Sequence, residues 1–179
     1  MSFSLPACFE KLGLMAWPLT LCLIVAIAVI LERLVFFAKA AIKQNADYEK
    51  LAQYLSENKN QAKNIRDELI SISLSEIQGY YYRGLKTLRI IGSIAPMIGL
   101  LGTILGIISA FKVIAGSTSA VAPNMIADGL WQAMLTTAFG LFIALPALLV
   151  AHFFKYLGDK KLGNLCLKLN KLSISFELK

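Results

Sequence analysis

The sequence predicts an all-α membrane protein with three membrane-spanning helices. Hydrophobic residues make up 57% of its 179 residues and charged residues 16%, whereas soluble domains average about 45–50% and about 25%. From Ile90 to Phe154 the chain has only two formal charges, Lys112 and Asp128, and a second apolar run covers 14–31. Because a helix needs roughly 20 apolar residues to cross a bilayer core, the longer segment fits two spans joined by a turn. A soluble enzyme is excluded as a leading interpretation, as is a nucleic-acid-binding protein.

The first span is expected at 17–37. Trp17 opens it, where an amphipathic ring favours the headgroup zone. Pro18 follows in the first helical turn, where its missing N–H costs little. The run is longer than the apolar core of a signal peptide, and Glu32-Arg33 rather than a small-residue cleavage site follows it. We therefore expect a retained span.

The region between the first and second spans is expected to be helical. Apolar residues recur at helical spacing in two stripes, separated by a polar break at 56–60. The stripes comprise Tyr48, Leu51, Ala52 and Leu55, and then Ala62, Ile65, Leu69 and Ile72. A single second helix from Gln61 to Ala115 would be about 80 Å long. The alternative is a set of shorter helices broken near Gly79 and Gly84.

The second span, expected at 90–115, has one face made of small residues. Gly99, Gly102 and Gly106 lie at three- and four-residue spacings. Small faces let membrane helices approach closely, because lipid supplies no hydrophobic force between them. We expect these glycines to serve in helix packing. Pro96 would free a backbone carbonyl and bend the helix, which is tolerable where neighbouring helices satisfy that carbonyl.

The third span is expected at 130–154. Its notable residues are Gln132, Thr136, Thr137 and Pro146, with Asp128 just before it. Asp128, Gln132 and Thr136 are spaced by four residues and therefore line one side of the outer half of this span. Thr137, like Thr103 of the second span, lies near the middle of its span. One interpretation is that these hydroxyls bond to carbonyls of their own helix; the other is that they line a polar interior. Pro146 is grouped with the packing residues.

The basic residues predict the orientation. Ten of the 18 lie between Arg33 and Arg89, and six lie from Lys155 onward. The positive-inside rule assigns the side that carries these 16 residues to the cytoplasm. The net charge of +7 is thus a topology signal, with a weak attraction to anionic membrane lipid and no nucleic-acid partner. The expected order is an outer N-terminus (1–16), the first span (17–37), a cytoplasmic helical region (38–89), the second span (90–115), an outer loop (116–129), the third span (130–154) and a cytoplasmic helical tail (155–179).

The tail carries a heptad pattern, and the spans lack a charge at mid-depth. Apolar residues of the tail alternate spacings of three and four, as in an a/d seam: Leu162, Leu165, Leu169, Leu172 and Phe176. We therefore expect the second and third membrane helices to extend into the cytoplasm and pack on each other. A proton path normally needs an ionisable group within the membrane. If this chain conducts protons, another chain must supply the titrating carboxylate.

Two segments carry a resemblance to a known family. Residues 92–103 read GSIAPMIGLLGT, and residues 133–141 read AMLTTAFGL, followed by ALPA. In that order they resemble the second and third spans of the ExbB/TolQ/MotA family. The segment LERL at 31–34 is a weaker match to the end of the first span. The resemblance covers about 88–154, and elsewhere it rests on topology alone.

Three spans and an outer N-terminus resemble the ExbB/TolQ branch more than the four-span MotA-like stators. The resemblance implies a bacterial inner-membrane subunit of a proton-driven motor, a homo-oligomer and typically a pentamer around ExbD- or TolR-like single-span subunits. It implies that Thr103 and Thr137 correspond to pore-facing hydroxyls, and that an aspartate of the partner carries the proton. The energy would pass to a TonB- or TolA-like protein. No cofactor and no metal are expected.

One position departs from the family pattern. Gln132 falls where many ExbB and TolQ proteins have a pore glutamate, and Asp128, one turn away, is the alternative source of that charge. This fits a divergent branch with a less acidic pore. We therefore hypothesise that the pore-lining residues are Thr103, Thr137, Gln132, Asp128 and Thr136.

The leading hypothesis is an ExbB-like proton-channel subunit that energises outer-membrane import. A TolQ-like role in envelope integrity is a close alternative, and a non-conducting membrane scaffold is a second class of function. A small-solute transporter fits less well, because the spans lack a charge at mid-depth and broken paired helices. No enzyme is expected, since no Gly is followed by Lys and a Walker A loop is therefore missing.

Overall fold

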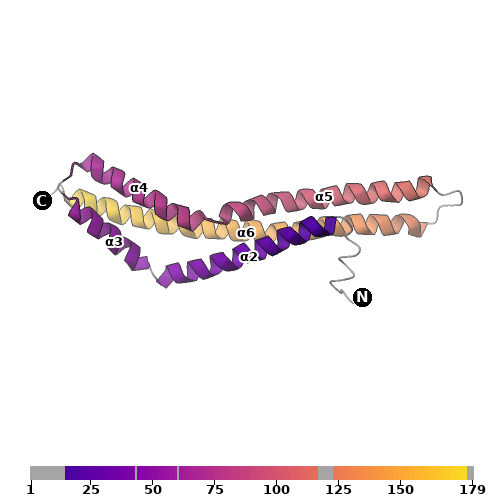
Figure 1. The fold of residues 1–179 in the computed structure, drawn as a ribbon, viewed down its shortest axis with the longest axis horizontal. Helices are drawn as coiled ribbons and strands as arrows, with labels where there is room; N and C mark the ends of the chain where they lie inside the picture. Colours follow the sequence, from indigo (N-terminus) through magenta and orange to yellow (C-terminus); the bar gives the residue numbers. More distant parts are fainter. Residues whose placement is uncertain (1–14, 43, 60, 117–122, 177–179) are drawn as a thin grey trace. The chain divides into compact units, whose positions relative to one another are not determined.

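The computed structural model describes residues 15–42, 44–59, 61–116 and 123–176. Across these ranges the secondary structure is helical: α2 (Ala16–Ile42), α3 (Gln44–Glu57), α4 (Lys63–Tyr82), α5 (Leu85–Ala115) and α6 (Pro123–Ser175) (Figure 1). Three stretches are long and apolar enough to cross a membrane, namely Ala16–Ala40, Leu85–Ala115 and Gly129–Ser175. The predicted fold class, an all-α membrane protein with three spanning helices, is confirmed.

The chain divides into two compact units. Unit 1 comprises Met1–Ile30 and Thr87–Val150, and unit 2 comprises Leu31–Lys86 and Ala151–Lys179. Unit 1 therefore holds most of α5 and the first half of α6, whereas unit 2 holds α3, α4 and the second half of α6.

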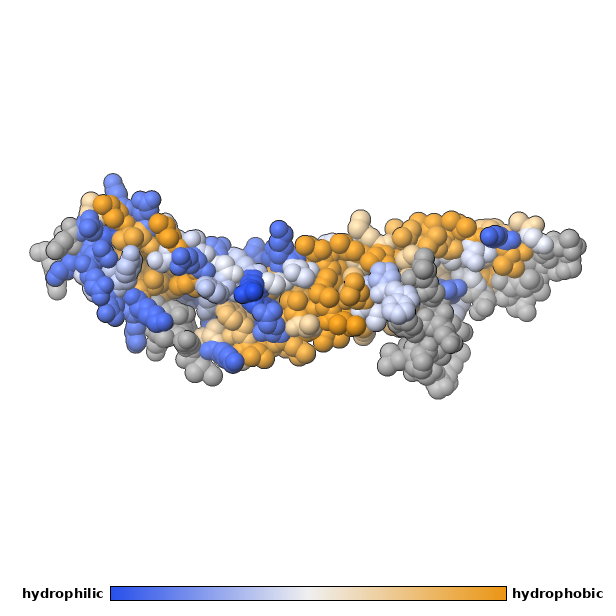
Figure 2. Space-filling view, in the orientation of Figure 1, coloured by the Kyte–Doolittle hydropathy of each residue, from blue (hydrophilic) through white to orange (hydrophobic). Residues whose placement is uncertain are grey.

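Unit 1 has small residues inside and large apolar residues outside. Ala95 and Ala147 have no exposed surface, and Ala133 and Ala144 are 2% exposed. The large side chains instead point outward on α5 and α6, as in Leu100, Ile108, Phe111, Met134, Phe142 and Leu149. Orange surface covers this part of the molecule in Figure 2. A contiguous apolar exterior of this kind is expected of a surface that contacts lipid or another membrane helix.

Unit 2 has a conventional hydrophobic core. Leu55 of α3, Ile70 of α4 and Leu169 of α6 are buried at its centre. Partly buried side chains pack around them, namely Tyr48, Leu51, Leu74, Leu165, Leu172 and Phe176. Tyr48, Leu51 and Leu55 of the predicted stripe at 48–55, and the predicted tail seam except its first residue, Leu162, therefore face this core.

The prediction of one continuous helix from Gln61 to Ala115 is wrong. α4 ends at Tyr82 and α5 begins at Leu85. Gly84 between them has φ 76°, a conformation that glycine adopts without the steric penalty of a Cβ. The alternative of shorter helices is correct at Gly84. Gly79 lies inside α4 and does not break it.

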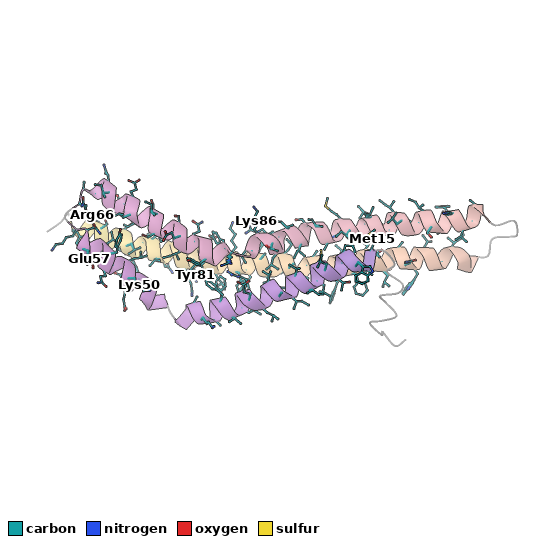
Figure 3. All side chains as sticks on the ribbon, viewed as in Figure 1. Met15, Lys50, Glu57, Arg66, Tyr81 and Lys86 are labelled. Carbon is teal, nitrogen blue, oxygen red and sulfur yellow. The ribbon has the colours of Figure 1, made fainter. Side chains whose placement is uncertain are left out.

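α4 confirms the helix predicted from the apolar stripe at 62–72, but this stripe is not the buried face of the helix. Ile65 is 46% exposed and Ile72 52% exposed, whereas Arg66 and Ile70 are 4% and 5% exposed. The helix buries a neighbouring face because the guanidinium of Arg66 finds acceptors there. Arg66, labelled in Figure 3, donates to the carbonyls of Lys59 (3.0 Å), Gln61 (2.9 Å) and Ser173 (3.2 Å). A buried charge is tolerated when it is fully hydrogen-bonded, and a hydrophobicity pattern does not detect this.

Candidate functional site in the α5–α6 hairpin

The α5–α6 contact in unit 1 is built from glycines that meet backbone or short side chains. A Cβ at Gly102 would lie 2.7 Å from Thr136 Oγ1, and one at Gly106 would lie 2.8 Å from Ala133 Cβ. A Cβ at Gly99 would lie 3.0 Å from Thr137 Cα. As the residue numbers of these glycines rise along α5, the numbers of the α6 residues that they meet fall, so the two helices run antiparallel. The contact leaves no space for side chains at these glycines.

The α6 side of this contact includes small residues that the sequence analysis did not select. A Cβ at Gly140 would lie 2.6 Å from the carbonyl oxygen of Ala95, and one at Gly129 would lie 2.8 Å from Ala110 Cβ. With Ala133 these glycines form a small-residue stripe at four- and seven-residue spacing. The spacing was visible in the sequence and is the membrane-helix packing pattern.

The three threonines make different hydrogen bonds. Thr137 Oγ1 donates to the carbonyl of Gly99 on α5, at 3.1 Å. Thr103 Oγ1 donates to the carbonyl of Leu100 at 2.6 Å, within its own helix. Thr136 is 2% exposed, and its Oγ1 donates to the carbonyls of Ala133 (2.7 Å) and Gln132 (3.2 Å). Thr103 and Thr136 thus follow the own-helix interpretation, whereas Thr137 links the two helices.

Helix geometry places Thr103 and Thr137 on the same side of the hairpin. At about 100° per residue, each lies roughly 70° around its helix from the centre of the small-residue contact, in the same sense along the chain. Because the helices are antiparallel, equal senses of rotation place both side chains on one side. Both are partly exposed there. A molecule beside this face would meet both threonines.

Gln132 lies on a different side of α6. It is five residues from Thr137, which is about 140° around the helix, and it is partly exposed. The hairpin therefore does not gather the predicted pore residues on a single face. The side chain of Asp128 lies outside the described residues. Thr136, the third residue of the predicted series Asp128, Gln132 and Thr136, is buried against Gly102.

The two predicted packing prolines lie inside helices. Pro96 is within α5 and Pro146 within α6, and both helices continue past them. Pro96 is partly buried, but Pro146 is exposed. Within the described parts of the chain, no group of three His, Cys, Asp or Glu residues could hold a metal ion. The hairpin thus offers hydroxyl groups and tight packing, and its described residues supply no carboxylate at the threonine face.

Comparisons with known proteins agree with this architecture. The family model described as the MotA/TolQ/ExbB proton channel family matches residues 36–165. The chain is 34% identical over 198 aligned positions to "Biopolymer transport protein exbB1" of Vibrio cholerae serotype O1, covering 94% of this chain and 86% of that protein. It is 32% identical over 114 positions to ExbB of Neisseria gonorrhoeae (59% of this chain, 51% of that protein).

The "Tol-Pal system protein TolQ" of Haemophilus influenzae is also similar, with 42% identity over 62 positions. That match covers 35% of this chain and 27% of the TolQ protein. The family match spans more than half of the chain and includes the whole small-residue hairpin with its three threonines. This chain therefore belongs to the MotA/TolQ/ExbB proton channel family, as a multi-pass membrane protein and proton-channel subunit.

Proposed function

We propose that this chain is an ExbB-like subunit of a bacterial inner-membrane motor that couples the proton motive force to outer-membrane import. One observation carries the choice of branch: the similarity to a biopolymer transport protein extends over 94% of the chain, whereas the TolQ similarity covers 35%. The proposed partners are further copies of this chain, typically five, an ExbD- or TolR-like single-span subunit, and a TonB- or TolA-like protein.

The proposed orientation follows the charges. The N-terminus and the loop at 116–129 lie in the periplasm, and the segments 38–89 and 155–179 lie in the cytoplasm. Sixteen of the 18 basic residues are then on the cytoplasmic side, in agreement with the positive-inside rule. A cysteine-accessibility assay on whole cells tests this. Labelling of a cysteine introduced in the segment 116–129 by a membrane-impermeant reagent is expected, and labelling of one introduced at Lys50 would contradict the topology.

The proposed proton path runs along the face that carries Thr103 and Thr137. A carboxylic acid crossing a membrane interior needs polar neighbours, because an ionised carboxylate without them is costly there. The Thr103 and Thr137 hydroxyls can accept a hydrogen bond from the protonated acid while they donate to the carbonyls of Leu100 and Gly99. In this mechanism the partner's aspartate binds and releases the proton, and the hairpin solvates it.

Substitutions of the two threonines test the path. Thr103→Val and Thr137→Val are expected to abolish energised uptake while the membrane complex still assembles. Thr137→Ser is the matched control, because it keeps the hydroxyl and should retain uptake. Full uptake in both valine variants would refute the proposed path. Loss of the assembled complex in Thr137→Val alone would instead point to a structural role for its bond to Gly99.

A TolQ-like role and a non-conducting scaffold remain the competing functions. Complementation separates the first: rescue of energised uptake in a strain without ExbB supports import, and rescue of detergent resistance in a strain without TolQ supports envelope maintenance. Gln132, where many relatives have glutamate, is the observation that favours a scaffold. Proton flux into liposomes that contain this chain and its single-span partner would exclude the scaffold. Absence of proton flux would refute the proposed channel function.

A further inference from the structure

Unit 2 contains a small pocket enclosed by three helices. Lys161, Asn164 and Lys168 of α6 line it, together with Tyr48 of α3 and with Ile77 and Tyr81 of α4. Tyr81 is labelled in Figure 3. The pocket has a volume of about 40 Å³, roughly three times the 10–15 Å³ that one ordered water needs on this measure. It can therefore hold a group with several polar atoms.

The ammonium group of Lys161 is buried in an unsatisfied state. Its Nζ is shielded from solvent and has no hydrogen-bond partner among the described residues. Removing a charged ammonium from water without a partner is unfavourable, and three N–H donors are left unpaired. Such a group calls for an anionic ligand rather than a neutral one.

Two other polar residues that line the pocket, Asn164 and Lys168, can also donate hydrogen bonds to an anion. Asn164 and Lys168 lie three and seven residues after Lys161, so all three side chains share one face of α6. The ammonium of Lys168 lies 5.5 Å from the centroid of the Tyr48 ring. The described lining residues include no carboxylate. Asp159, the nearest described carboxylate along α6, instead accepts a hydrogen bond from the Tyr82 hydroxyl.

We propose that this pocket binds a phosphate group, held by Lys161 and Lys168 with Asn164 as a third donor. Lysine is a common phosphate ligand, and charge-assisted hydrogen bonds to a phosphate are stronger than those between neutral groups. A tetrahedral phosphate presents more acceptor oxygens to the three donors that line the pocket than a planar carboxylate does. The phosphate belongs either to an anionic phospholipid headgroup or to a free phosphate ion. The inference is independent of the proposed transport role.

Two binding measurements on the purified full-length chain test the proposal. The first titrates the delipidated protein in detergent with inorganic phosphate at constant ionic strength, followed by ³¹P NMR and thermal unfolding. The second measures phosphatidylglycerol that remains bound, by native mass spectrometry. Lys161→Gln and Lys168→Gln are compared with Lys160→Gln, which removes the same charge from an exposed neighbouring position.

We expect Lys161→Gln and Lys168→Gln to weaken binding by at least about tenfold, because each removes a charged hydrogen-bond donor. Lys160→Gln should weaken it by less than about twofold, since it alters only surface charge. Lys161→Gln should also raise the unfolding temperature in phosphate-free buffer, because it removes a buried unpaired charge. Binding of inorganic phosphate identifies the free ion, and binding of phosphatidylglycerol alone identifies the lipid. No binding of either, equal losses in all three variants, or equal stabilisation by an acidic peptide would overturn the proposal.

Discussion

Gly140→Ala is the most direct test of the α5–α6 contact. The added Cβ would lie 2.6 Å from the carbonyl oxygen of Ala95, where ordinary contact begins at 3.4 Å. The obstacle is backbone, so no side-chain rotation relieves it. The helices must separate locally by up to about 0.8 Å, the difference between these two distances.

That separation has a further consequence for Thr137. Its hydrogen bond to the Gly99 carbonyl is 3.1 Å long, and an added 0.8 Å would place the pair beyond hydrogen-bonding distance. Overpacking costs about 1–3 kcal/mol and the lost interhelical bond about 0.6–2 kcal/mol. Replacing a helical glycine by alanine offsets about 1 kcal/mol of this. The expected net loss is therefore about 0.6–4 kcal/mol.

Reversible unfolding of the purified chain in mixed detergent micelles measures this loss. Gly163→Ala is the matched control on the same helix, because a Cβ there has no neighbour within 4 Å; it is expected to stabilise the chain by about 0.5–1 kcal/mol. If Gly140→Ala unfolds within about 0.5 kcal/mol of Gly163→Ala, the two helices do not pack as closely as described and the reasoning fails.

Five further substitutions, two of them controls, test unit 2 by the same unfolding assay. Gly84→Ala should destabilise by about 1–2 kcal/mol, because φ 76° is unfavourable for a residue with a Cβ; Gly79→Ala, in open space within α4, should not. Ile70→Ala should cost about 2–5 kcal/mol and Ile72→Ala less than about 0.5 kcal/mol, since they are 5% and 52% exposed; equal costs would contradict the observed face of α4. Arg66→Met should cost about 1–3 kcal/mol, because it leaves three carbonyl acceptors without their donor, and a neutral result would show that water replaces the guanidinium.

The sequence alone predicted the three spanning helices and the core-facing stripes of α3 and of the tail. The three apolar stretches depend on the length of uncharged runs, and the heptad seam at 162–176 and the stripe at 48–55 depend on periodicity; both are local properties of the chain. The GSIAPMIGLLGT segment likewise indicated the family from sequence, and the family match covers it. The glycines at 99, 102 and 106 were recognisable as a small face, although the sequence did not say which helix they meet.

The tertiary structure decided what depends on distant partners or on backbone conformation. Arg66 is buried because the carbonyls of Lys59, Gln61 and Ser173 surround it, and no local pattern predicts the Ser173 acceptor, which lies 107 residues away along the chain. The break at Gly84 requires a positive φ. A glycine permits this conformation but does not impose it. Thr103, Thr136 and Thr137 have the same side chain, yet of the three only Thr137 donates a hydrogen bond to the neighbouring helix. Residue type sets what a side chain can do, and the angle at which its helix packs sets which of these it does.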